Sequence, residues 1–313
     1  MNARLKLFCA WLLLLLFVGM CLAQYRRRRS SGDGPVHYTE GSVMVDENTM
    51  TTAREVASHS TDVPVWTNSP GFEKDVFTFC RIVFPYNFEG ASGGTWITDF
   101  PDSDLNLSFR VQQMTSLRVS PDGRFLRLKN KDLYNYPWIY MVEPGGLLLT
   151  DEDAEILRNY LFNGGFLMAD DFWGELQWRN FHEQMKKVFP EREFVELSMD
   201  HPVFHTVFSI TVPKQQLQTP NYVQGIRSLN PNSYDYGVTW EDRHADIVPD
   251  GAREMHVRAI TDDKGRIMVI ATHNCDNGDG WEREGEHDGF FHEFSEKRAF
   301  PLGINIIFYA MTH

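Results

Sequence analysis

Short β-rich runs alternate with segments of helical periodicity along most of this chain, from about residue 71 to the C-terminus. Strand–helix–strand units of this kind build a parallel sheet that is covered by helices on both faces. The sequence therefore predicts an α/β fold. We expect strands at 76–84, 138–142, 166–169 and 266–272, and helices at 105–117, from 150 onwards, at 175–189 and at 302–311.

The helix after residue 149 has clear start and stop signals. The Thr150 hydroxyl is expected to cap the free amides of its first turn, and Asp151, Glu152 and Asp153 suit the positive end of the helix dipole. Asn163 and the two glycines that follow it are expected to end the helix, because glycine tolerates the left-handed conformation of a helix cap.

The N-terminus has the pattern of a secretory signal. Arg4 and Lys6 precede an almost wholly apolar run at 7–22, and Ala23 offers the small residue at which a signal peptidase cuts. The run is shorter than the about 20 residues of a membrane-spanning helix. We expect a cleaved signal peptide at 1–23 and export to the periplasm or cell envelope. A retained anchor and a lipoprotein attached at Cys21 are the alternatives.

Residues 24–70 have little apolar content at their start and are expected to form a flexible linker, with a possible short helix at 51–58. The apolar density rises at about residue 71 and stays high. The remaining roughly 240 residues are enough for one sizeable core, so we expect a single α/β domain at 71–313.

The chain is acidic, with 30 Lys and Arg against 43 Asp and Glu and a formal net charge of −13 at pH 7. This balance argues against nucleic acid as a partner, because nucleic-acid binding needs a basic surface. The one basic run consists of Arg26, Arg27, Arg28 and Arg29. It either contacts anionic lipid at a membrane surface or is a solvated flank. The other candidate partners are an envelope protein and a glycan, and the sequence does not identify a cofactor.

Two cysteines remain after the predicted cleavage site. Cys80 lies in an apolar run and Cys275 in a polar loop. Two cysteines do not make a disulfide framework, and we expect this pair to be unbonded.

Polar side chains gather where the predicted strands end. Glu143 follows the second strand, Asp170 and Asp171 follow the third, and His273 and Asn274 follow the late strand. Open parallel sheets bind ligands at the carboxyl ends of their strands. We therefore expect Glu143, Asp171 and His273 at one edge of the sheet, with Asn274 beside them.

Two interpretations of the adjacent Asp170 and Asp171 remain open. Neighbouring carboxylates repel each other unless a cation, a donor or a proton lies between them, so one is a candidate general base or metal ligand together with His273. The alternative is a cap for the next helix plus a solvated acid. Asp276 and Asp279 are likewise either metal ligands or parts of Asn-Gly and Asp-Gly turns.

Tryptophans near acids are the last candidates for a site. Trp96 with Asp99, and Trp173 beside Asp171, are combinations with which proteins bind sugars through stacking and hydrogen bonds. The alternative is packing in the core or between loops.

Eight short motifs, taken in order, resemble the bacterial family called domain of unknown function 4159 over about 75–313. They are Phe77-Thr78-Phe79 with Arg81, Trp96 to Pro101, Tyr136-Pro137, Leu157 to Leu161 with Gly164-Gly165, Phe166 to Asp171, His201 to Phe204, His273 to Trp281, and Gly303-Ile304-Asn305. The resemblance implies a class I glutamine amidotransferase-like fold, which is a flavodoxin-like sheet with helices on both faces.

The same resemblance bears on the chemistry. Active members of that fold carry a cysteine on the turn after a central strand, and here the matching turn, Ala169 to Phe172, has neither cysteine nor serine. Amidotransfer through a thiolate is therefore not expected. Trehalose-utilisation-type relatives of the fold suggest carbohydrate by analogy alone.

Two classes of function follow. The first, which the missing nucleophile favours, is a non-catalytic binding or assembly module of the cell envelope. The second is a hydrolase of a sugar or an envelope polymer that uses Asp170 or Asp171, with or without a metal.

Overall fold

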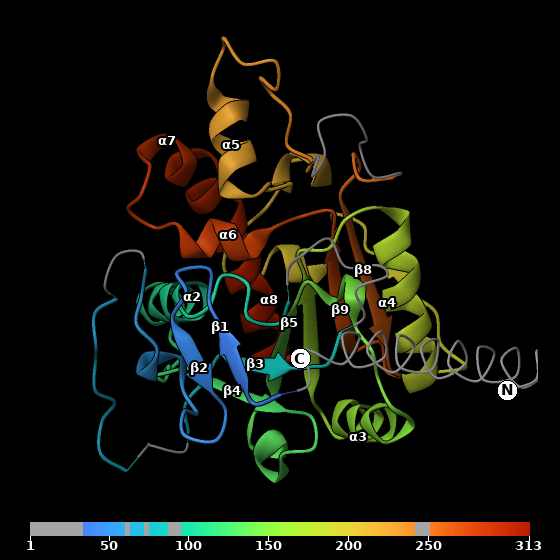
Figure 1. The fold of residues 1–313 in the computed structure, drawn as a ribbon. Helices are drawn as coiled ribbons and strands as arrows, with labels where there is room; N and C mark the ends of the chain where they lie inside the picture. The colour runs from blue at the N-terminus through green and yellow to red at the C-terminus, as the bar shows by residue number, and fades with distance from the viewer. Residues whose placement is uncertain (1–33, 60–62, 72–74, 87–94, 242–250) are drawn as a thin grey trace, which may run out of the picture. The chain divides into compact units, whose positions relative to one another are not determined.

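The centre of the protein is a mixed sheet, seen in a computed structural model that describes residues 34–59, 63–71, 75–86, 95–241 and 251–313. Within these residues seven strands pair in the order β4-β3-β5-β6-β9-β8-β7 (Figure 1). The strands are β3 (Cys80–Val83), β4 (Arg124–Arg127), β5 (Trp138–Val142), β6 (Phe166–Asp170), β7 (Val195–Glu196), β8 (His256–Thr261) and β9 (Ile267–His273).

Five of these strands form a parallel core. Neighbours β4, β3, β5, β6 and β9 are all paired in parallel. Numbered along the chain, the five parallel strands have the spatial order 2-1-3-4-5, which is the order of flavodoxin-like folds. The predicted α/β flavodoxin-like fold is confirmed at this level, and the more specific likeness to the class I glutamine amidotransferase fold stays a prediction.

The other edge of the sheet is antiparallel, which the sequence did not predict. β8 pairs antiparallel with β9, and β7 with β8. Only residues 262–266 connect β8 to β9. A parallel pair needs a crossover of about a dozen residues, so a connection this short permits only a hairpin.

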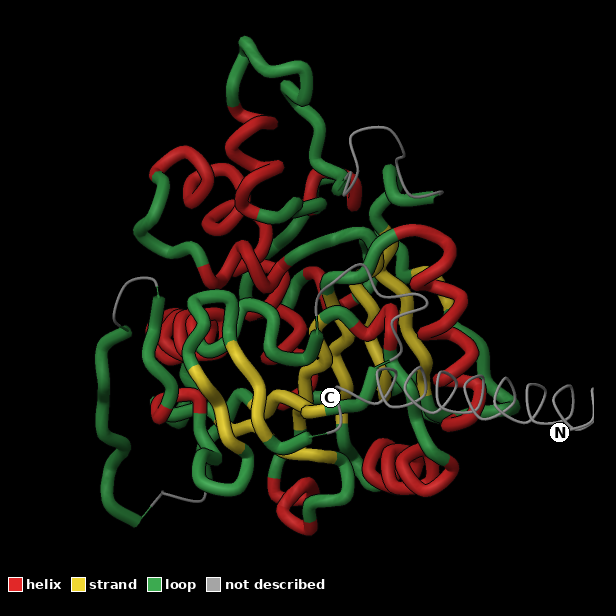
Figure 2. Tube along the Cα trace, in the orientation of Figure 1, coloured by secondary structure: helices red, strands yellow, loops and turns green. Residues whose placement is uncertain are grey.

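Helices lie beside the sheet in Figures 1 and 2. They are α2 (Asp102–Met114), α3 (Asp151–Phe162), α4 (Gly174–Val188), α5 (Tyr222–Leu229), α6 (Asn277–Glu282), α7 (Asp288–Phe290) and α8 (Phe300–Thr312). A π-helical segment, Phe291–Ala299, joins α7 to α8, and five short 3-10 helices lie at Ala53–Glu55, Lys131–Asn135, Pro144–Gly146, Pro202–Phe204 and Lys214–Leu217.

Alternate strand residues contribute to two separate cores. Ile139 of β5 packs in a cluster with Leu157 of α3 and Phe181 of α4, whereas Tyr140 packs in a second cluster with Ile304 of α8. Since successive side chains of a strand point to opposite faces, helices cover both faces of the sheet.

Several predicted boundaries are wrong by a few residues. The first predicted strand, 76–84, is reduced to Cys80–Val83, and the predicted helix at 51–58 is the single turn Ala53–Glu55. α3 is as predicted: the Thr150 hydroxyl accepts a hydrogen bond from the amide of Asp153, and the Asp153 carboxylate accepts one from the amide of Thr150.

A hairpin lies within the residues that the sequence assigns to a linker. β1 (Val36–Tyr38) and β2 (Met44–Asp46) pair antiparallel. Glu47 ties the hairpin to the sheet, because its carboxylate binds both His37 and Arg127 of β4. The compact unit that contains the sheet begins at Pro35. The predicted signal segment and the four arginines at 26–29 lie outside the described residues.

Cys80 and Cys275 are both buried and free, as predicted. None of the helices in the described parts of the chain combines the length and the apolarity that crossing a bilayer requires.

Candidate functional site

A pocket of about 640 Å³ opens at the carboxyl ends of the parallel strands. Glu143 follows β5, Asp171 follows β6, and Asp276 follows β9. The β3–β5 boundary, where the strand order reverses, is the usual binding position in such sheets. The described lining residues are Tyr38, Thr39, Glu40, Thr95, Ile97, Thr98, Asp99, Glu143, Asp171, Asn221, Glu241, Asp276 and Asp279.

Acidic side chains dominate this lining. Seven of the described lining residues carry a carboxyl group, and none of them is Lys, Arg or His. The seven are Glu40, Asp99, Glu143, Asp171, Glu241, Asp276 and Asp279. The pocket therefore has the electrostatic character of a cation site.

Asp99 is held in the pocket wall by a buried arginine. The guanidinium of Arg81, on β3, donates to the carbonyl oxygens of Trp96 (2.9 Å) and Thr98 (2.8 Å), and it binds the carboxylate of Asp104. These bonds fix the backbone just before Asp99. Asp99 is 2% exposed, and its Oδ2 atom has no hydrogen-bond partner among the described residues.

Asp171 is positioned by a backbone bond and by an indole. Its amide donates to the carbonyl of Cys275 (3.0 Å), which ties the turn after β6 to the turn after β9. The indole of Trp173 donates to Asp171 Oδ1 at 2.9 Å.

Four non-glycine residues at this edge of the sheet have left-handed backbones: Asp99, Glu143, Asp171 and Asn274, with φ of 60°, 48°, 55° and 60°. Residues other than glycine rarely adopt this conformation, and it persists where the surrounding structure enforces it. Three of the four line the pocket.

Asp276 and Asp279 lie at the start of α6. Asp276 Oδ1 accepts a hydrogen bond from the amide of Asp279 (2.7 Å). Asp279 in turn accepts from the amide of Tyr222 (2.5 Å) and pairs with Arg283 (3.3 Å). The Asp279 carboxylate thus has both an amide and a cation as partners.

Crowding changes the acidity of two of these groups. Burial, followed by repulsion from Glu282 and Asp279, raises the pKa of Asp99 well above its usual value. Burial, followed by repulsion from Asp171 and Asp279, raises the pKa of Asp276 in the same way. Both groups therefore hold a proton to a higher pH than an ordinary aspartate does.

Asp170 does not line the pocket. It is fully buried, and it accepts hydrogen bonds from Tyr140, from Thr272 and from the amides of Asn277 and Gly278 at the start of α6. Burial raises the pKa of Asp170 to about 6. With these donors around it, the carboxyl anchors α6. Neither Asp170 nor Asp171 caps α4, which begins after Trp173 without a side-chain cap.

His273 lies at the predicted edge but not in the described pocket lining. Its Nε2 atom donates to the carbonyl of Gly174 (3.1 Å), and its ring lies against Phe172 and Trp178. Burial, with repulsion from Arg258, lowers the pKa of His273 to about 3, so the ring is neutral. This ring supports the start of α4 and is not among the described residues that line the pocket.

The other three predicted residues also lie behind the pocket wall. Trp96 is buried against His37, Phe100 and Phe125. The side chain of Asn274 accepts from the amide of Gly174 and donates to the carbonyls of Gly251 and Glu254. Trp173 acts on the pocket through its bond to Asp171. Trp96, Trp173 and Asn274 are all absent from the described lining of the pocket. Stacking of a sugar on Trp96 or Trp173 is therefore not supported.

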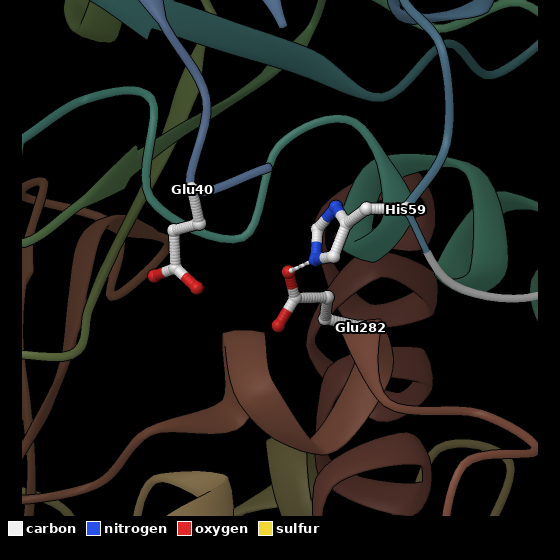
Figure 3. Close-up of side chains that lie close together, drawn as sticks. All are labelled: Glu40, His59 and Glu282. Carbon is white, nitrogen blue, oxygen red and sulfur yellow. Dashed lines mark ion pairs between the residues drawn. The ribbon is translucent and has the colours of Figure 1, made fainter. Parts of the chain in front are cut away.

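A second acidic group lies next to the pocket and has its own cations. Figure 3 shows the His59 ring pointing at the Glu282 carboxylate, with Glu40 nearby. His59 pairs with Glu282 (2.6 Å) and with Asp102 (2.9 Å), and these hydrogen bonds raise the pKa of His59 to about 10. Arg283 also pairs with Glu282 (2.6 Å).

Five of the lining acids were candidate site residues from the sequence: Asp99, Glu143, Asp171, Asp276 and Asp279. Glu40 and Glu241 were not predicted. Glu40 comes from the β1–β2 hairpin, and Glu241 follows α5. Neither residue follows a parallel strand, so the rule that ligands bind at the carboxyl ends of parallel strands does not predict them.

A family model described as "Domain of unknown function (DUF4159)" matches residues 84–311. The match includes every described lining residue except those of the hairpin. No curated protein matches the chain.

Proposed function

The chain belongs to the DUF4159 family, and we propose that it is a non-catalytic binding module of the cell envelope whose pocket takes a positively charged ligand. The observation that carries this proposal is the lining itself, in which seven carboxyl groups surround one cavity. Groups this close repel one another, and a bound cation removes the repulsion. An anionic ligand would add to it.

Two further features favour binding over catalysis. The turn after β6, where a nucleophile is expected in this type of fold, reads Ala-Asp-Asp-Phe and has neither cysteine nor serine. The first acid in that turn, Asp170, is buried and accepts hydrogen bonds from Asn277 and Gly278 of α6, so it holds the helix in place and does not face the pocket.

The proposed location rests on the N-terminal sequence. Arg4, Lys6 and the apolar run at 7–22 have the form of a signal peptide. We propose that the module acts after export, in the periplasm or at the cell envelope. N-terminal sequencing of the stable protein in cells tests this, and a stable form that begins at Met1 would argue against cleavage.

The alternative function is a hydrolase of a sugar or an envelope polymer. Asp171 favours it, because this carboxyl lines the pocket and the Trp173 indole fixes its orientation. Hydrolysis of an envelope glycan by the purified protein, lost in an Asp171→Asn variant, would replace the binding proposal with this one.

Calorimetry with a panel of small ligands tests the binding proposal. The purified protein is titrated with Ca²⁺, Mg²⁺, spermidine, citrate and trehalose, at about 0.02 M and about 0.5 M salt. We expect at least one cation to bind, more weakly at the higher salt concentration, and neither citrate nor trehalose to bind. Binding of citrate or trehalose in the absence of any cation binding would overturn the proposal.

A further inference from the structure

We propose that the pocket holds one divalent metal ion, bound by the carboxylates of Asp99, Asp171 and Asp276. This inference rests on the proposed function, because it names the cation that the acidic pocket takes. It also assigns the three ligands.

The three carboxylates are close enough to share an ion. One oxygen of each lies within 4.8 Å of the other two. The oxygens around a calcium ion lie 2.3–2.6 Å from it, so two opposite ligands are separated by about 4.6–5.2 Å. The observed spacing therefore permits coordination of one ion without movement of the backbone.

The ligands come from rigid and well-separated parts of the chain. Asp99 follows β3, Asp171 follows β6, and Asp276 follows β9. Arg81 fixes the backbone before Asp99, and the bond from the amide of Asp171 to the carbonyl of Cys275 connects the other two turns. The three residues are 2%, 2% and 3% exposed, so the surrounding structure encloses all of them.

Asp99 gives an independent sign of a ligand. Its Oδ2 atom is enclosed, yet no described residue donates a hydrogen bond to it. Buried acceptors nearly always have a partner, and an enclosed carboxylate oxygen without one needs an explanation. A metal ion at this position supplies the missing partner.

Gly278 preserves the space around that oxygen. A Cβ atom added to Gly278 would overlap with Asp99 Oδ2. The absence of a side chain at Gly278 therefore allows the Asp99 carboxylate to occupy its position beside α6.

Two neighbouring groups of acids are poorer metal sites, because cationic side chains of the protein already pair with them. Asp99, Asp279 and Glu282 also come together, as do Glu40, His59 and Glu282. Arg283 already pairs with both Asp279 and Glu282, and His59 pairs with Glu282. An ion in either group would have to displace a guanidinium or an imidazolium. The sequence had proposed Asp276 with Asp279 as metal ligands, and the structure favours Asp276 with Asp99 and Asp171.

The ligand chemistry selects the class of ion. Three carboxylates offer only hard oxygen atoms, and the described pocket lining contains no histidine or cysteine. Ca²⁺, Mg²⁺ and Mn²⁺ prefer such ligands, whereas Zn²⁺ and Cu²⁺ favour nitrogen or sulfur. We therefore expect Ca²⁺, Mg²⁺ or Mn²⁺, with water completing the coordination.

The test compares substitutions that remove one charge and keep the local hydrogen bonds. Asp171→Asn retains an oxygen for the Trp173 indole, and Asp276→Asn retains the cap of α6, because Asn and Asp cap about equally well. Asp263→Asn is the matched control: it lies in the turn before β9, at the opposite end of that strand, and its side chain is 90% exposed. Glu143→Gln removes a charge from the pocket wall without removing a proposed ligand.

The metal-stripped protein and its variants are titrated with Ca²⁺, Mg²⁺ and Mn²⁺ by calorimetry, and circular dichroism checks that each variant is folded. We expect one ion per chain. Asp171→Asn and Asp276→Asn should each weaken binding at least about tenfold, since ligand charge sets the affinity of such sites. Asp263→Asn should have no effect, and Glu143→Gln a smaller effect than either ligand variant.

The possible failures are distinguishable. If spermidine binds and no divalent ion does, this inference is overturned and the proposed function stands. Equal losses from Glu143→Gln and the two ligand variants would also overturn the three-aspartate site, because diffuse charge would then explain the binding. If nothing cationic binds, both proposals are overturned.

Crystals of the unmodified protein grown with Mn²⁺ give a measurement that needs no variant. Anomalous density is expected between Asp99, Asp171 and Asp276. A peak beside Glu282 instead, or no peak, would refute the assignment.

Discussion

Arg81 is a cation with no exposed surface, and its contacts show how a single residue shapes the pocket. Its guanidinium binds the carboxylate of Asp104 and two backbone carbonyls of the segment that leads to Asp99. Such a group is stable in the core only when each of its donors has a partner. The position of Asp99 in the pocket is therefore coupled to the stability of the core.

Replacement of this arginine tests the coupling. Arg81→Met leaves Asp104 buried without its cation, so we expect a loss of about 3–5 kcal/mol in the free energy of unfolding, measured with urea. The double variant Arg81→Met with Asp104→Leu removes both charges and should recover part of that loss. A single variant that is as stable as the wild type would show that the pair contributes nothing.

His59 has a similar role between elements. It connects the segment after the first short helix to α2 through Asp102 and to α6 through Glu282. Both carboxylates are buried, so the imidazolium provides the charge that they need. Because Asp276 caps the start of α6, this contact helps to hold a proposed metal ligand in place.

The His59 contact predicts a pH dependence of stability. The pKa of His59 is about 10 in the folded protein, against 6.5 ordinarily, because both carboxylates bond to its ring. A raised pKa contributes stability that is fully present below about pH 6.5 and is lost as the pH rises toward 10. We expect His59→Gln to cost about 2 kcal/mol at pH 6 and much less at pH 10, as measured by urea unfolding across this range. A cost that stays constant or grows with pH would contradict the ion-pair interpretation.

Elements whose signals are local were predicted well, and those set by tertiary contacts were not. The cap at Thr150 was read from neighbouring residues. Strand β4 and the antiparallel β8 depend on pairing across the sheet and were missed. Which of Asp170 and Asp171 lines the pocket also depends on tertiary contacts. Phe166 and Met168 of β6 face the core that includes α8, and Asp170, two residues further on, points to the same side of the strand. Asp170 therefore meets the amides of α6, while Asp171 turns into the pocket.

At the scale of the whole molecule, charge and topology act together. The chain carries a net charge of −13, and seven acids converge on one pocket at the point where the strand order reverses. A negative protein with a concave negative site concentrates cations there and speeds their association. The sequence predicted five of the seven acids that line this pocket, in part through the rule that ligands bind at the carboxyl ends of parallel strands, but it gave no sign of Glu40, which comes from the N-terminal hairpin.

That contribution makes the start of the folded unit a testable boundary. A chain that begins at Pro35 keeps the whole compact unit, and we expect it to melt at the same temperature as the full chain.

A chain that begins at residue 71, where apolar density rises, lacks the hairpin, Glu40 and His59. Loss of His59 leaves Asp102 and Glu282 buried without that cation, and loss of the hairpin uncovers Trp96. Loss of the His59 contact costs about 2 kcal/mol, as for His59→Gln, and loss of the hairpin packing adds to that cost, against a typical domain stability of about 5–15 kcal/mol. We therefore expect the shorter chain to be largely unfolded or to melt far lower, as judged by circular dichroism and calorimetry. Equal melting temperatures for the two truncated chains would show that residues 35–70 are dispensable and that the folded unit begins at residue 71 instead.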